Sequence, residues 1–108
     1  MPASFQLTPR ALDDDDLDQI WSFIAQDSVN AANRVESAIL TACGVLARNP
    51  LLGSKRTEIT RHPVRFWTVS RFPNFIVVYR PETKPLQVVA VLHGNRNIHA
   101  LLDEPDAL

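Results

Sequence analysis

The sequence predicts a single α+β domain, in which a helical hairpin packs on one face of a twisted sheet. The 108 residues are enough for one hydrophobic core but not for two ordinary domains, so we expect one domain over residues 1–108. Two helical patterns follow each other closely, and three strand-like runs come after them with short connections that require antiparallel neighbours. A hairpin lying on one face of the sheet would bury every apolar stripe.

The first element is a short strand, because Phe5 and Leu7 alternate with polar residues and Pro9 follows. The next apolar stripe indicates the first helix and consists of Leu17, Ile20, Trp21 and Ile24.

A helix starting at Thr8 and Pro9 would direct Asp13 toward the core, where an unpaired carboxylate is costly. We therefore expect the helix to begin at Asp13 or Asp14, with the aspartates of residues 13–16 capping it. A metal site is the weaker alternative, because consecutive helical side chains point in different directions.

The second helix follows a tight turn at Asp27 and Ser28 and stops at Asn49 and Pro50. Such a short connection predicts an antiparallel hairpin. The inner face of the second helix is expected to hold Val35, Ile39, Ala42 and Leu46. Gly44 weakens the helix, and we expect it to serve close packing.

A polar loop over residues 51–63 precedes three strand-like runs at residues 64–71, 74–80 and 86–93. This loop carries Lys55, Arg56, Arg61 and His62. The tail over residues 98–108 is expected to add at most a short helical turn before Pro105.

Charge is distributed unevenly along the chain. The first 50 residues hold three arginines and seven acidic residues, whereas residues 51–100 hold eight basic and two acidic residues. The near-neutral total argues against a general nucleic-acid binder, but the basic half suggests an acidic or phosphate-bearing partner.

The sequence also indicates the cellular compartment and whether a metal or another cofactor is expected. The single cysteine, Cys43, is expected in the core, and no spacing of Cys and His predicts a zinc site. No signal peptide or membrane span is visible, so we expect a cytoplasmic protein that needs neither a metal nor another cofactor and does not bind a membrane.

Basic residues of the strands are the candidates for binding a target, and they comprise Arg65, Arg71, Arg80, His93 and Arg96. They could form one concave basic face around a phosphate or an acidic peptide. Alternatively, they could cap strand ends, stack on aromatic rings and bond the acidic tail. His93 has a pKa suited to proton transfer, but no acidic or hydroxyl partner lies near it in sequence. Gly94 is expected to allow a turn with positive φ.

Several motifs together resemble the RelE/ParE toxin superfamily, and specifically its ParE branch, over residues 5 to about 102. These motifs are LTPRA, DLDQIWSFIAQDS, NPLLGSKR, VRFWTVSRFPNFIVVYR and VLHGNRNI. About two extra residues separate PRA from DL, at the acidic run. The resemblance implies a toxin of a type II toxin–antitoxin system, in which ParE-like members poison DNA gyrase by binding. A cognate ParD-like antitoxin would neutralise it, and no sequence-specific contact with nucleic acid is implied.

RelE-like members instead cleave mRNA on the ribosome with basic residues on the middle strands and a C-terminal tyrosine or histidine. In this chain the matching positions hold Trp67, Val69, Ile76 and Leu102, and only Arg96 stays basic. Apolar side chains cannot stabilise a phosphate transition state, so no catalytic residue is assigned. The alternatives are a RelE-like endonuclease and a module that binds the antitoxin without being toxic.

In complexes of this family, a C-terminal antitoxin segment wraps the helical hairpin and the sheet. The resemblance therefore makes Trp21, Phe23, Lys55, Arg56 and Trp67 the candidates for contacting the antitoxin. Phe23 lies away from the centre of the apolar stripe, so it is either an incidental exposed aromatic or an anchor under that segment.

Overall fold

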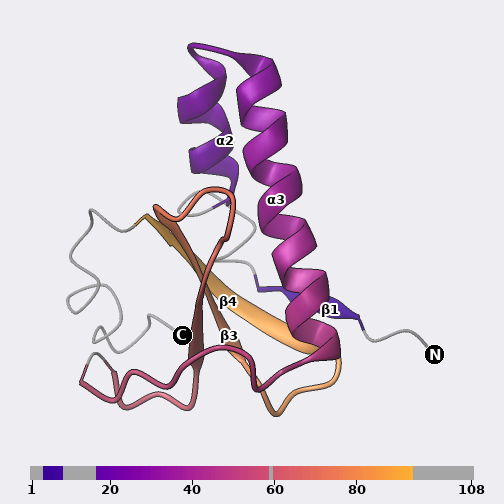
Figure 1. Cartoon of the computed structure of the whole chain (residues 1–108), viewed down its shortest axis with the longest axis vertical. Coiled ribbons are helices and arrows are strands. Elements are labelled where there is room, and N and C mark those ends of the chain that lie inside the picture. The colour runs from indigo at the N-terminus through magenta and orange to yellow at the C-terminus, as the bar shows by residue number, and fades with distance from the viewer. Residues whose placement is uncertain (1–3, 9–16, 59, 94–108) are drawn as a thin grey trace.

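The computed structural model describes residues 4–8, 17–58 and 60–93 and has the expected α+β fold (Figure 1). Its elements in chain order are β1 (Phe5–Leu7), α2 (Leu17–Ala25), α3 (Val29–Arg48), β2 (Arg65–Thr68), β3 (Phe75–Arg80) and β4 (Leu86–His93). The predictions for the acidic run at residues 13–16, for Gly94 and for the tail lie outside the described residues.

The sheet has the strand order β1-β4-β3-β2, so β1 and β2 occupy its two edges. The pairs β2–β3 and β3–β4 are antiparallel, as predicted from the short connections. β1 lies parallel to β4, with Phe5 opposite Leu86, which makes the sheet mixed. The alternation in the first residues identified a strand but carried no information about the edge that it joins.

The two faces of the sheet pack differently. On one face, Val35, Ile39 and Leu46 of α3 form a buried cluster with sheet residues such as Val77 and Val88. The opposite face has its own buried cluster of Val64, Phe66, Val78, Val89, Ala90 and Leu92. Because β4 contributes to both clusters, its sequence is a nearly continuous apolar run without polar alternation.

The helical hairpin forms as predicted, and its outer end extends beyond the sheet (Figure 1). Ser28 caps α3, since its Oγ accepts a hydrogen bond from the N–H of Ala31 at 3.1 Å. Asn49 ends α3, and its N–H donates to the carbonyls of Val45 and Leu46.

The expectation that Gly44 serves close packing is wrong, because a Cβ there would meet no atom within 4 Å.

A buried clamp holds the chain that leaves α3 against the sheet. The Tyr79 hydroxyl donates to the carbonyl of Pro50 at 2.6 Å and accepts from the N–H of Gly53 at 2.8 Å. Arg65 donates to the carbonyl of Gly53 at 2.6 Å. Gly53 is required here, because a Cβ would lie 2.6 Å from the Tyr79 hydroxyl oxygen and 2.9 Å from the Phe66 carbonyl oxygen. The clamp therefore fixes where the following basic loop begins.

Candidate functional site

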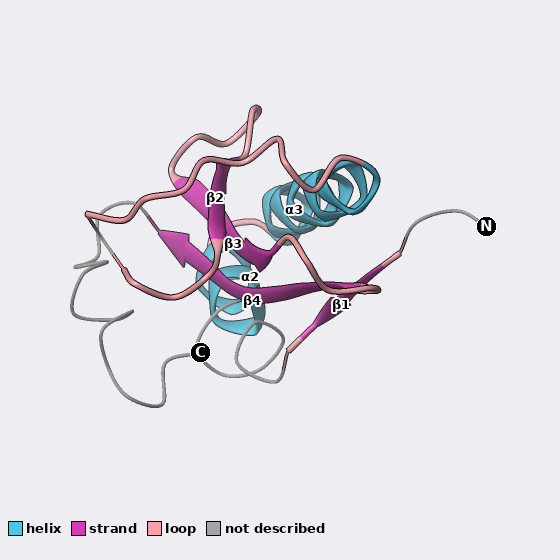
Figure 2. Ribbon diagram, turned by 90° about the horizontal axis from the view of Figure 1, so that it is seen from below, coloured by secondary structure: helices cyan, strands magenta, loops and turns pink. Residues whose placement is uncertain are grey.

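A groove lies between α3 and the end of the edge strand β2 with the connection that follows it. Figure 2 shows α3 and β2 along the same side of the molecule. Its volume is about 470 Å³. On α3 it is lined by Asn33, Arg34, Ser37, Ala38, Thr41, Ala42 and Val45, and on the strand side by Trp67, Val69, Ser70, Arg71 and Phe72. We call this feature the helix–strand groove.

The helix–strand groove arises from the sequence of α3. The stripe of Val35, Ile39 and Leu46 is buried against the sheet, and a second stripe of small side chains lies beside it. The side chains of Ala38 and Thr41 on this second stripe are too short to fill the space between α3 and the segment of residues 67–72. The groove is therefore a consequence of small residues placed next to the core stripe.

The lining of the helix–strand groove is apolar at its floor and cationic at its sides. The floor includes Ala38, Val69 and half-buried Trp67. Arg34 from α3 and Arg71 from the β2–β3 connection are exposed, and no carboxylate is among the described residues that line the groove. Such a lining suits an amphipathic segment with apolar side chains and at least one carboxylate.

Beside this groove, the backbone edge of β2 is open at Thr68. Phe66 exchanges two hydrogen bonds of 2.9 Å with Ser54, which covers the first part of the edge. Because the backbone direction alternates along a strand, the N–H and C=O of Thr68 also point away from β3, and within the described part of the chain they have no partner. An extended segment could pair there.

The described target-binding candidates do not gather on one face. Arg65, half-buried, belongs to the clamp, and Arg80 lies on the opposite face, where it donates to the Gln87 side chain at 2.8 Å. At the other end of the sheet, His93 contacts Phe75 edge-on with ring centroids 5.2 Å apart, and Arg71 lines the helix–strand groove. Arg96 lies outside the described residues.

The antitoxin-binding candidates lie at different parts of the surface. Trp67 forms part of the groove floor, and the Trp21 Nε1–H donates to the Asn33 side chain at 2.9 Å, at the groove's lining. Phe23 is 74% exposed. Because residues two apart in a helix project in nearly opposite directions, Phe23 lies on the side of α2 away from Trp21. Lys55 and Arg56 belong to the loop beyond the clamp, and Arg56 also pairs with Glu58.

Groups for covalent or acid–base chemistry are not brought together in the described residues. Burial raises the pKa of the Cys43 thiol to about 12, so this cysteine is not nucleophilic. No cluster of His, Cys, Asp and Glu in the described residues could hold a metal ion. Val69, at a position where RelE-like members carry a basic residue, is buried at 2% exposure.

Comparison with known proteins assigns the family. The family model of the ParE toxin of the type II toxin–antitoxin system parDE matches residues 5–98. The chain belongs to the ParE toxin family. This confirms the resemblance found in the sequence, and a ParE toxin has an antitoxin as its partner.

The fold agrees with this ParE assignment. A solved structure from a chromosomal ParDE toxin–antitoxin system of P. aeruginosa is similar to the chain, with a TM-score of 0.67 and 22% sequence identity. The similarity covers 85% of this chain and 96% of that chain. No curated protein sequence matches the chain. Among the described residues, no α-helix combines the length and apolar character needed to span a bilayer.

The sequence analysis missed two residues that shape this ParE surface, one exposed and one buried. Arg34 on α3 was not singled out, although it lies four residues before Ala38 and eight before Ala42 on one side of the helix. A search for a small-residue stripe beside the core stripe would have found it. Tyr79 was counted only as part of an apolar strand, and no local pattern reveals its hydrogen bonds to residues 50 and 53.

Proposed function

We propose that the protein inhibits DNA gyrase by binding to it, and that its cognate antitoxin neutralises it by occupying the helix–strand groove. The observation that carries the proposal is the groove itself, with an apolar floor and an arginine on each side. It provides a surface for a protein segment, whereas the described residues bring no proton-transfer groups together.

The groove and the adjacent strand edge complement each other as an antitoxin site. Burial of the apolar floor would supply the main driving force for association. Arg34 and Arg71 would pair with carboxylates and orient the segment, and the open edge at Thr68 would hold an extended backbone. The acidic, apolar segment expected from the basic half of the chain fits this surface.

Membership of the ParE family supports gyrase inhibition. A second support is that apolar residues occupy positions where RelE-like members carry the basic residues that cleave RNA. Trp67 and Val69 lie toward the helices, and Ile76 belongs to the opposite face of the sheet. None of these side chains donates a hydrogen bond to a phosphate oxygen, except through the indole N–H of Trp67. Binding to the target therefore accounts for toxicity better than cleavage of mRNA.

A supercoiling assay with purified gyrase tests the proposal. The protein should inhibit supercoiling and trap cleaved DNA, and the antitoxin encoded beside it should restore activity. Arg96→Ala should weaken inhibition several-fold while circular dichroism stays unchanged. Arg48→Ala is the matched control, since Arg48 is exposed at the end of α3 and belongs to neither set of candidates. The same preparations should leave mRNA intact on ribosomes.

Three outcomes would contradict the proposal. Supercoiling that is unaffected at a large molar excess of folded protein excludes gyrase as the target. Ribosome-dependent cleavage of mRNA would identify an endonuclease instead. Antitoxin binding without either activity would identify a module that has kept the antitoxin surface alone.

A further inference from the structure

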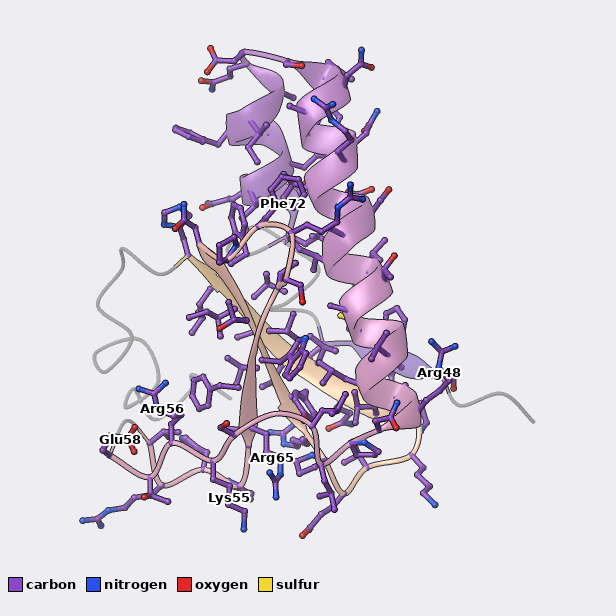
Figure 3. All side chains as sticks on the ribbon, viewed as in Figure 1. Arg48, Lys55, Arg56, Glu58, Arg65 and Phe72 are labelled. Atoms are coloured by element: carbon purple, nitrogen blue, oxygen red, sulfur yellow. The ribbon has the colours of Figure 1, made fainter. Side chains whose placement is uncertain are left out.

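A second cationic surface lies beyond the clamp, at the opposite end of the molecule from the turn of the helical hairpin (Figure 3). We call it the basic loop, and it comprises Lys55, Arg56, Arg61, His62 and Arg65. These side chains line one hollow of about 210 Å³, together with Thr57, Thr60, Pro63, Val64, Pro81 and Glu82. The helix–strand groove has no residue in common with this hollow.

The charge of the basic loop is only partly neutralised within the described residues. Arg56 pairs with Glu58, and among the described residues Glu82 is the one carboxylate that lines the hollow. Arg65 donates hydrogen bonds to the carbonyls of Leu51 and Gly53, and no carboxylate pairs with it among the described residues. For the side chains of Lys55, Arg61 and His62, no hydrogen bond or ion pair is found in the described part of the chain.

The backbone holds these cations near one another despite their repulsion. The clamp fixes Gly53, and Ser54 pairs with Phe66 on the edge of β2. Buried Thr60 donates its N–H to the carbonyl of Arg56, and its Oγ1 accepts from the N–H of His62 at 3.2 Å. These hydrogen bonds restrain the backbone near Ser54, Thr60 and His62, so less conformational entropy is lost there when an anion binds.

From these observations we propose that the basic loop binds the phosphate backbone of duplex DNA without regard to sequence. This deepens the proposed function, because DNA is the substrate on which gyrase acts. Cations and hydroxyl groups suffice to contact phosphates, and they carry no sequence information. A peptide partner is less suitable, since the exposed leucines before the loop, Leu51 and Leu52, do not line the hollow.

Fluorescence anisotropy with a labelled DNA duplex and the full chain, without gyrase, tests the inference. Each phosphate contact contributes about −0.9 to the slope of log K against log salt, so about three contacts predict a slope of about −3. Two duplexes of unrelated sequence should bind equally well at low salt.

The double variant Lys55→Glu/Arg61→Glu should reduce affinity at low salt by at least about tenfold and bring the slope to about −1. Both side chains are exposed, so urea unfolding should show an unchanged midpoint. Arg48→Glu makes the matched control with unchanged affinity, because Arg48 is exposed at the end of α3 and does not line the hollow; in Figure 3 it lies to the right of the labelled loop residues.

Three results would overturn the inference. They are an absence of DNA binding at low salt, an equal loss of affinity in the Arg48→Glu control, and displacement of the duplex by polyglutamate as readily as by unlabelled DNA. The last result would assign the basic loop to an acidic protein instead. Because the assay contains no gyrase, failure of the proposed gyrase inhibition would not change its outcome.

Discussion

At the scale of single residues, two glycines of similar appearance in the sequence have opposite roles. Gly53 lies against the Tyr79 ring and the Phe66 carbonyl, so that only a residue without Cβ fits. Gly44 lies within α3 with open space where its Cβ would be. One glycine is therefore needed for the clamp, and the other only weakens a helix.

Gly53→Ala is expected to destabilise the protein by about 1–3 kcal/mol, the usual cost of overpacking, because Tyr79 must move and its buried hydrogen bonds lengthen. Gly44→Ala is the matched substitution and should stabilise it by about 0.5–1 kcal/mol. Free energies of unfolding in urea measure both. Equal effects of the two substitutions would show that the clamp does not constrain Gly53.

At the scale of elements, α3 has two functions on adjacent stripes. One stripe packs on the sheet and holds the hairpin in place. The other forms a wall of the helix–strand groove and places Arg34 opposite Arg71. Since both stripes belong to one rigid helix, the position of the groove wall is set by the packing of the core.

Charge reversal at the groove, in Arg34→Glu/Arg71→Glu, should weaken antitoxin binding by about tenfold or more, mainly through slower association. Both arginines are exposed, so stability should stay unchanged. Biolayer interferometry with the purified antitoxin, at two salt concentrations, measures the rates. Arg48→Glu is the control, and an identical association rate for all three proteins would remove the arginines from the antitoxin site.

At the scale of the whole molecule, the buried Cys43 thiol and Tyr79 hydroxyl make the free energy of unfolding depend on pH in the alkaline range. Burial raises the pKa of Cys43 to about 12, and burial also raises the pKa of Tyr79 above its usual value, against the opposing effects of the Gly53 hydrogen bond and the Arg65 charge. Both groups stay protonated in the folded protein at a pH where the unfolded chain already loses these protons.

The free energy of unfolding should therefore change little through these two groups below about pH 8, and should fall as the pH rises above about 9. Urea unfolding between neutral pH and pH 10.5 or so measures the slope. Cys43→Ala should make the decrease between about pH 9 and 10 shallower, because the unfolded thiol ionises in this range. An identical slope in the variant would mean that the thiol does not contribute.

Much of the fold followed from local patterns along the chain. The alternation around Phe5, the helical stripe through Val35 and Ile39, and the stop at Asn49 and Pro50 all reflect short-range geometry, and the structure confirms them. The positions of the candidate site residues were less predictable. Arg65 and Arg80 both belong to strands, but their faces depend on pairing with Tyr79 and Gln87.

The sequence by itself determined the order of helices and strands, the hairpin and the ParE family, because periodicity and motifs depend on neighbouring residues. Only the tertiary structure decided that β1 joins β4 in parallel, that Tyr79 clamps Gly53, and that the helix–strand groove and the basic loop are separate surfaces. These features join residues far apart in the chain, and their contacts are set by how the helices and the sheet pack, which no local pattern encodes.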